Sequence, residues 1–457
     1  MSTRISRNLN VLLILILLIV ISSSSILFSQ NSSDEWKVGV ARQNITPQYP
    51  TWMAGYAMRT SPSEGKLHDI WAKAITFEDT NGMRSILITT DLLSISKEFS
   101  EPFKNKIKQK YGLEKSQIIL NCSHTHSGPV ISRALQYIYP MSSSDWSIVD
   151  KYTKELEINL LQLVDESMER LVPAKIYTQN GVTRFQVNRR NNKETDLQNT
   201  TSLNGPNDYA VPVIKVEGLD NNLIAIIFGY ACHPTTLSIN KFSGDYPGFA
   251  QIELEKLYPG TMAMFFQGAG GDQNPLPRRS IPLAIQYGKQ LASSVGRVLS
   301  EEMMKQDSKL VTKYSEIDLP FDDPLSLEEF QEVAQGGDYQ AKWAQGMIDD
   351  LIKKGSLRES YPFPIAYWKL GDQEMFILGG ESVIAYSLKL KEIFGEQVFV
   401  MSYANDVMGY IPSEIILDEG GYEGDTAQRV YGLPAKWDKS IETLIISGMK
   451  NLVNQEK

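Results

Sequence analysis

Short apolar runs and longer amphipathic stretches alternate along this chain. The runs at 85–90 and 212–216 have the length and apolar character of buried strands. The stretches at 147–171 and 281–304 are long enough to form helices. This alternation predicts an α/β fold in which a mixed β-sheet core is flanked by helices.

The segment 307–361 departs from this pattern because it is rich in charged residues. Within it, Ser326 stands three positions before Glu329, which is typical of a capped helix start. We therefore expect helices here, as a surface elaboration near the entrance of the functional site.

The amino terminus has the layout of a targeting segment. Arg4 and Arg7 precede an apolar run at 11–21, which is followed by four serines at 22–25. Three more apolar residues after the serines extend the run to about 18 residues, so an uncleaved membrane anchor is the alternative to a signal peptide. We assign 1–30 to one of these two and expect an exported protein, either periplasmic, extracellular or membrane-anchored.

Composition indicates a soluble enzyme. Hydrophobic residues make up 42% of the chain and charged residues 22%, and the formal net charge of −9 argues against a nucleic-acid partner. The motif residues described below are scattered from position 38 to position 424, so one site must draw on the whole chain. We therefore expect a single large catalytic domain at 36–457. The sequence does not predict an oligomeric state.

Three of the four histidines lie in two short segments that each end an apolar run. His124 and His126 follow the run that begins at 118, and His233 follows the run at 223–230. A strand repeats its side-chain direction every two residues, so His124 and His126 should project from one face. Three imidazoles at strand ends suit a catalytic Zn²⁺ site. The alternative is that they are core or turn histidines held by hydrogen bonds.

Several short motifs stand out along the chain. They are His-Thr-His-Ser-Gly-Pro at 124–129, Asn-Arg at 188–189, Tyr-Ala-Cys-His-Pro-Thr-Thr at 230–236, Gly-Gly-Asp-Gln-Asn-Pro at 270–275, Gly-Glu at 380–381, Gly-Tyr-Ile at 409–411 and Gly-Tyr-Glu-Gly at 421–424. In this order they resemble the motifs of the neutral/alkaline, non-lysosomal ceramidases, and the resemblance extends over residues 36 to 450.

The resemblance implies a ligand set and an activity. Zinc would be held by His124, His233, Glu381 and Tyr410, with a position left for the attacking water. The activity would be zinc-dependent hydrolysis of the amide bond of an N-acyl lipid such as ceramide, yielding a sphingoid base and a fatty acid. Peripheral contact with a membrane would accompany such a substrate.

The resemblance also implies catalytic roles for residues around the metal. His126 would transfer protons or hold the developing oxyanion, while Arg189 and Tyr422 would point polar groups at the scissile amide. Taken alone, Glu381 is an acidic residue at a strand end and would more often cap a helix. Tyr410 and Tyr422 would by default be half-buried tyrosines. Arg189 could equally form a solvated surface pair with Arg190.

Asn274 departs from the family pattern. It stands where characterised ceramidases carry a serine, and an amide side chain cannot act as a serine nucleophile. If that serine is essential for ceramide cleavage, the substrate here is a different amide or ester, or the protein is a non-catalytic ligand-binding homologue. If a metal-activated water attacks, Asn274 still positions it. The chain ends at Lys457, which leads us to expect no carboxy-terminal β-sandwich domain of the kind found in family members.

Three further residues lie inside these motifs. Cys122 and Cys232 are expected to be buried free thiols, because a bridge between them would oppose the pattern that brings the histidines together. Thiolate ligation of zinc by Cys122 remains a less favoured option. Asp272 either caps a helix that starts near Pro275 or orients a ligand histidine.

Overall fold

The computed structural model describes residues 35–455. The expected signal peptide or anchor at 1–30 lies outside the described residues. Within the described range, no helix is both long enough and apolar enough to cross a membrane.

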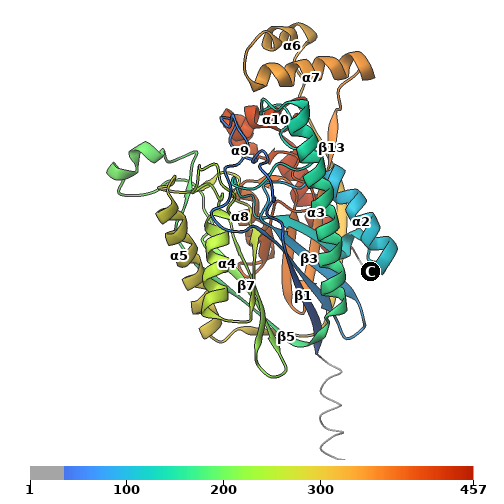
Figure 1. The fold of residues 1–457 in the computed structure, drawn as a ribbon, viewed down its shortest axis with the longest axis vertical. Coiled ribbons are helices and arrows are strands. Elements are labelled where there is room, and N and C mark those ends of the chain that lie inside the picture. The colour runs from blue at the N-terminus through green and yellow to red at the C-terminus, as the bar shows by residue number, and fades with distance from the viewer. Residues whose placement is uncertain (1–34, 456–457) are drawn as a thin grey trace, which may run out of the picture.

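A large mixed sheet forms the centre of the molecule (Figure 1). Its strands are β1 (Trp36–Asn44), β2 (Trp71–Glu78), β3 (Arg84–Thr90), β4 (Ile118–Cys122), β5 (Val172–Val182), β7 (Ala210–Gly218), β8 (Leu223–Tyr230), β9 (Met262–Gln267) and β11 (Met304–Gln306). The strand order is β4-β3-β2-β1-β5-β7-β8-β9, with β11 beside β5. The pairs β3·β4 and β8·β9 are parallel and the other neighbours are antiparallel. The predicted α/β class with a mixed sheet is confirmed, and the runs at 85–90 and 212–216 lie within β3 and β7.

A second, four-stranded sheet packs against one face of the first. It consists of β12 (Leu310–Pro320), β13 (Ser360–Leu370), β14 (Gln373–Leu378) and β16 (Phe399–Met401) in that order. Side chains of β13 alternate between two cores: Ala366 and Trp368 pack against the large sheet, whereas Ile365 and Tyr367 face the helices on the far side. Burying each large apolar side chain contributes about 1.5–3 kcal/mol, so this two-sided packing holds the sheets together.

Helices cover the outer faces of both sheets. In Figure 1, α2 (Lys97–Tyr111) and α3 (Ser143–Glu169) lie on the right, over β1 to β4, and α4 (Asp245–Leu257) and α5 (Ile281–Ser300) lie on the left, over β7 to β9. The second sheet is covered by α8 (Ile384–Phe394) and α11 (Ile441–Asn454). The helix expected at 281–304 ends at Ser300, because the following residues pair as β11 with β5.

The helical prediction for 307–361 is correct only in its centre. Helices α6 (Leu327–Ala334) and α7 (Tyr339–Lys354) lie at the top of Figure 1, and the predicted capping box joins Ser326 and Glu329. The prediction is wrong for β12, which pairs along its whole length with β13. Charged residues are compatible with this strand because it lies at the edge of its sheet and most of its side chains are half-buried.

The two edge strands of the large sheet, β4 and β9, approach each other. The side-chain Oδ1 of Asn121 in β4 accepts a hydrogen bond of 3.0 Å from the backbone N–H of Gln267 in β9. Its Nδ2 donates to the backbone oxygen of Ser402 at 2.6 Å. The large sheet therefore curves so that its two edges meet. The loop after β4 and the loop after β8 come to lie side by side, although the two strands are far apart in the strand order.

Short paired elements complete the region around these loops. The backbone of β15 (Glu381–Ser382) pairs in parallel with β17 (Tyr410–Ile411), and β6 (Gln186–Asn188) pairs with β10 (Gln273–Pro275). The helix α9 (Glu414–Glu419), a π-helical turn at Tyr422–Thr426 and α10 (Ala427–Val430) follow β17. These elements lie close to the ends of β4 and β8 and carry the remaining residues of the candidate site.

Candidate active site

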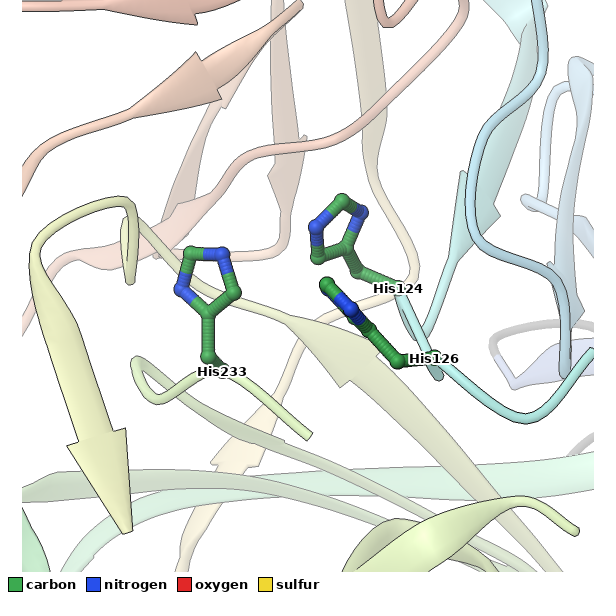
Figure 2. Close-up of side chains that lie close together, drawn as sticks. All are labelled: His124, His126 and His233. Carbon is green, nitrogen blue, oxygen red and sulfur yellow. The ribbon is translucent and has the colours of Figure 1, made fainter. Parts of the chain in front are cut away.

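Three histidines converge where β4 and β8 end (Figure 2). The candidate ligand nitrogens of His124, His126 and His233 all lie within 4.8 Å of one another. The ring centroids are 5.0 Å apart for His124 and His233 and 5.1 Å apart for His124 and His126. The prediction that the two segments meet is therefore confirmed, and the group is compatible with a metal site.

The backbone reason for this convergence differs from the predicted one. We expected the strand to continue through His126, but β4 ends at Cys122 and His124 has a left-handed φ of 63°. The backbone N–H of His124 donates to the carbonyl of Leu92 at 2.9 Å, which fixes this turn. A left-handed non-glycine residue is uncommon and is often found at functional sites, where the surrounding structure holds it.

Hydrogen bonds orient the two innermost imidazoles. His124 Nδ1 lies 2.7 Å from the carbonyl oxygen of Leu93, and His233 Nδ1 lies 2.7 Å from that of Gly270. A carbonyl can only accept, so each Nδ1 carries a proton, and the neutral form of such a ring has its lone pair on Nε2. Burial, reinforced by the charge of Arg189, lowers the pKa of His233 to about 4, so this ring is neutral at neutral pH.

Both Nε2 lone pairs face the same carboxylate. Nε2 of His124 and Nε2 of His233 each lie 3.0 Å from Oε2 of Glu381, and the hydroxyl of Tyr410 lies 3.1 Å from Nε2 of His233. With both rings neutral, two Nε2 lone pairs and a carboxylate oxygen have no proton to share between them. A cation at this point would satisfy all three groups, so the donor set fits a metal ion.

Glu381 and Tyr410 come together through the backbone. They are register partners in the β15·β17 pair, which begins directly after Gly380 at a left-handed φ of 59°. Burial raises the pKa of the Tyr410 phenol, and the nearby Arg189 opposes this rise. Glu381 does not cap a helix, so the default interpretation of this residue is wrong.

Two further tyrosines contact Glu381 and were not predicted. The hydroxyl of Tyr431 donates to Oε1 of Glu381, and the hydroxyl of Tyr403 lies 3.5 Å from Oε2. Tyr403 has a left-handed φ of 55°. Neither tyrosine lies in one of the recognised motifs, and nothing in the local sequence separates them from the other tyrosines.

His126 differs from the other two histidines in having no hydrogen-bond partner. Neither ring nitrogen has one among the described residues, although both atoms are buried. Burial and the neighbouring His124 hold the pKa of His126 well below its ordinary value. The ring packs against Tyr56 at 4.9 Å, and Gly55 approaches so closely that a Cβ there would lie 2.6 Å from Nδ1. A buried group without a partner is costly, so these nitrogens are available for a metal, a water or a substrate.

Arg189 connects the metal-binding group to the outer part of the site. Its Nε donates to Glu423 at 2.7 Å, Nη2 donates to the hydroxyl of Tyr410 at 3.1 Å, and Nη1 lies 3.5 Å from Oδ1 of Asn274. Arg190 turns outward to Glu419 and to the second oxygen of Glu423. The two arginines are therefore not a solvated pair, and Glu423 joins them.

Asn274 and Tyr422 border an open cavity beside Arg189. This entrance cavity has a volume of about 680 Å³. Tyr422 is 44% exposed, and its ring centroid is 5.4 Å from that of Tyr410. Asn274 is buried in β10, where it is the register partner of Val187 in β6. The residues predicted around the scissile amide thus share one wall between the histidines and solvent.

The predicted roles of Asp272 are both wrong. Its carboxylate accepts from the backbone N–H of Ile384 at the start of α8 and from the side chain of Asn188, each at 2.9 Å. It therefore caps a helix that lies far away in the sequence and holds the backbone before Arg189. No contact with a histidine is involved.

Both cysteines are buried and free, as predicted. The thiol of Cys122 donates to the carbonyl of Leu93 at 3.2 Å, and burial raises its pKa. A protonated thiol turned to a carbonyl is not a metal ligand, so ligation by Cys122 is not supported.

Comparison with known proteins identifies the family. Residues 36–281 match the family described as neutral/alkaline non-lysosomal ceramidase, N-terminal. The chain is 26% identical over 277 residues to neutral ceramidase A of Dictyostelium discoideum, covering 55% of this chain and 37% of that protein. It is also 26% identical over 249 residues to neutral ceramidase B of the same organism, covering 50% of this chain and 33% of that protein. The aligned region thus spans about a third of the length of these two relatives.

Solved structures show the same fold. The neutral ceramidase from Pseudomonas aeruginosa superposes with a TM-score of 0.70 at 17% identity, covering 92% of this chain and 75% of that one. A ceramidase complexed with C2 superposes with a TM-score of 0.67 at 17% identity, covering 87% and 74% of the two chains. Because the family description matches more than half of the sequence, this chain belongs to the neutral/alkaline non-lysosomal ceramidase family.

Proposed function

We propose that this protein is a zinc-dependent hydrolase that cleaves the amide bond of an N-acyl lipid such as ceramide to a sphingoid base and a fatty acid. The observation that carries the proposal is the convergence of two imidazole Nε2 atoms on one carboxylate oxygen, each at 3.0 Å. Membership of the family supports the class of reaction, and the names of the similar proteins support the substrate.

The donor set suits zinc. His124, His233, Glu381 and Tyr410 offer two nitrogens and two oxygens, which Zn²⁺ accepts readily. When bound in such a site, zinc polarises a carbonyl and lowers the pKa of a water molecule so that it can attack near neutral pH.

The chain's own residues supply orientation and proton transfer. The free nitrogens of His126 lie beside the ligand group, where they can accept a proton from a water or donate one to a leaving amine. Arg189 and Asn274 present N–H groups beside Tyr410, where they can stabilise negative charge on the carbonyl oxygen. Because His126 also belongs to the three-histidine group, its role as a proton carrier rather than a ligand is part of the proposal.

A second candidate substrate is a different amide or an ester. It is favoured by Asn274, which stands where the family resemblance places a serine, and by the charged residues among those that line the entrance cavity. An active protein that prefers such a substrate over ceramide would support this candidate.

The deciding experiment combines metal analysis with a hydrolysis assay. Purified protein is analysed for bound metals and assayed with ceramide, with simpler N-acyl amides and with the matching esters, before and after chelation and readdition of zinc. We expect about one zinc per chain and amide hydrolysis that chelation removes and zinc restores. A zinc-loaded protein that hydrolyses none of these compounds would leave the non-catalytic homologue as the better interpretation.

Export is a separate part of the proposal, and it rests on the targeting pattern at 1–30. Expression of the full-length chain, followed by cell fractionation and amino-terminal sequencing, distinguishes a cleaved signal from an uncleaved anchor. Recovery of uncleaved protein in the cytosolic fraction would contradict it.

A further inference from the structure

The entrance cavity is positively charged, although the chain as a whole has a formal net charge of −9. Four cationic and two anionic side chains line it, and among the described residues that do so Leu276 is the only aliphatic one. The cations are Arg189, Arg190, Lys193 and Arg278, and the carboxylates are Glu194 and Glu423. An N-acyl lipid without charge gains little binding free energy from these charged side chains.

The positive charge is not fully neutralised by internal ion pairs. Glu423 accepts from both Arg189 and Arg190, and Arg190 has a second partner in Glu419. Arg278 pairs with Glu194 at 3.1 Å, and Lys193 forms no salt bridge with a described residue. Because Arg278 is balanced by Glu194, Lys193 is the lining cation that leaves a net positive charge on the cavity wall.

Arg279 does not line the cavity, but it follows Arg278 directly in the chain and adds a cation on the side of the histidines. Arg279 is exposed, forms no salt bridge within the described part of the chain and has a left-handed φ of 77°. Its guanidinium lies 5.9 Å from the ring centroid of Tyr56, whose ring packs 4.9 Å from that of His126. We refer to Lys193, Arg278 and Arg279 as the cationic rim.

Asn274 adds a hydrogen-bond donor to the same wall. Its side-chain Oδ1 accepts from the hydroxyl of Thr235 at 3.3 Å and lies 3.5 Å from Nη1 of Arg189. The oxygen is thus occupied, while no described residue accepts a hydrogen bond from Nδ2. Asn274 is only 3% exposed, yet Nδ2 is not among the fully buried polar atoms that have no partner, so its N–H groups face the cavity and are free to donate to a ligand or to water.

We infer that the entrance cavity binds an anionic group of the N-acyl compound, held by the cationic rim and by the amide of Asn274. Guanidinium and ammonium groups pair with oxyanions through charge-assisted hydrogen bonds, which a neutral hydroxyl does not match. The anion is either a carboxylate, as in an N-acyl amino acid, or a phosphate monoester on the amine portion. The inference rests on the proposed function, because it names the class of substrate for the same site.

Three compounds with one acyl chain test it. N-dodecanoylglycine carries a carboxylate, N-dodecanoylethanolamine carries a neutral hydroxyl in its place, and the O-phosphate of the latter carries a phosphate monoester. Binding to the zinc-loaded protein is measured by calorimetry and hydrolysis is measured separately. We expect at least one of the anionic compounds to bind about ten-fold or more tightly than the neutral one, and the stronger of the two identifies the source of the anion.

Variants that remove positive charge test whether the cationic rim causes the preference for anionic compounds. Lys193→Gln/Arg279→Gln removes two cations without leaving a carboxylate unpaired, and Lys289→Gln on α5 is the control because it is exposed and is not part of the cationic rim. The double variant should lose about ten-fold in the preference for the anionic compound and keep its affinity for the neutral one. The control should retain both affinities.

The outcomes separate the inference from the proposed function. Equal or tighter binding of the neutral compound by the wild type, or an anionic preference unchanged in the double variant, would overturn the inference even if all three compounds are hydrolysed. Preferential binding of an anion that the double variant loses, without hydrolysis of any compound, would uphold the anion site and count against the proposed hydrolase.

Discussion

His233 and Glu381 are separated by 148 positions in the chain, yet Nε2 of one lies 3.0 Å from Oε2 of the other. The Nδ1–H of His233 is held by the carbonyl of Gly270, and the backbone of Glu381 is held by its pairing with Tyr410. Backbone groups thus fix the orientation of both residues in this contact. Such preorganisation is expected where a metal ion must find its ligands in place.

Loss of an imidazole ligand should remove the metal. We expect His124→Ala and His233→Ala each to abolish both zinc content and hydrolysis, because each substitution removes a direct bond and leaves an incomplete set of ligands. Metal content by elemental analysis and turnover are measured together. The matched control is His68→Ala, since His68 contacts Ser243 and Phe249 outside the cluster and should retain zinc. Full zinc occupancy in both ligand variants would contradict the assignment.

His126 should be separable from the ligands by the same two measurements. We expect His126→Ala to keep most of its zinc and to lose about 100-fold or more in turnover, as is typical for a proton carrier or oxyanion donor. Its unpaired ring nitrogens are the reason for this expectation. If zinc is lost to the same extent as in His124→Ala, His126 is instead a third imidazole ligand.

Tyr431 should support Glu381 in binding the metal. Tyr431→Phe removes the hydroxyl that donates to Oε1 of Glu381 and keeps the ring in place. We expect zinc affinity to fall by about 10- to 100-fold, the usual effect of losing a partner of a metal ligand, with little loss of folding stability. Tyr367→Phe is the control, because that hydroxyl contacts Glu374 on the second sheet. Equal zinc affinities in the two variants would exclude a role for Tyr431.

Asn274 should tune the choice of substrate without being a nucleophile. We expect the wild type to hydrolyse some N-acyl compound without an acyl-enzyme intermediate, and Asn274→Ser to shift the preference between ceramide and simpler amides more than it raises activity. Both proteins are assayed side by side with their zinc content known. A zinc-loaded but inert wild type that the single serine activates on ceramide would show that a required catalytic group had been lost.

Asp406 should make stability depend on pH. Burial raises the pKa of this carboxyl to about 7, while its hydroxyl partner Tyr361 opposes the rise. A raised pKa means that the folded state binds more protons than the unfolded state between about pH 4 and about pH 7. The stabilising contribution of the protonated acid is therefore fully present at low pH and is lost as the pH rises through 7.

Asp406→Asn should abolish this dependence. We expect the wild type to lose roughly 1–4 kcal/mol relative to the variant between about pH 4 and about pH 8, measured by denaturant unfolding of the metal-free proteins. The amide oxygen can accept from the backbone N–H of Lys97, and the amide N–H can donate to the hydroxyl oxygen of Tyr361, which reverses the direction of that bond. A difference between the two proteins that stays constant over this range would refute the assignment.

The sequence predicted the parts of the site whose chemistry is visible in short motifs. His124 and His233 stand out because histidines are rare in this chain and because each comes just after an apolar run, where the strand ends. Glu381 and Tyr410 were identified only through the family resemblance, because a single acidic or aromatic residue at a strand end has many other uses. Glu423 and Tyr431 were missed for the same reason.

Periodicity and composition by themselves determined the alternation of strands and helices, the α/β class and the placing of the imidazoles after apolar strands, although not the residue at which β4 ends. Tertiary structure alone decided that β4 and β9, at opposite ends of the sheet order, approach each other and bring the histidines together. It also decided that the charged segment at 310–320 is an edge strand and that Asp272 caps α8 rather than serving a histidine. The physical reason is that side-chain periodicity records which face of an element is buried, whereas sheet curvature and contacts between distant residues depend on how all the elements pack at once.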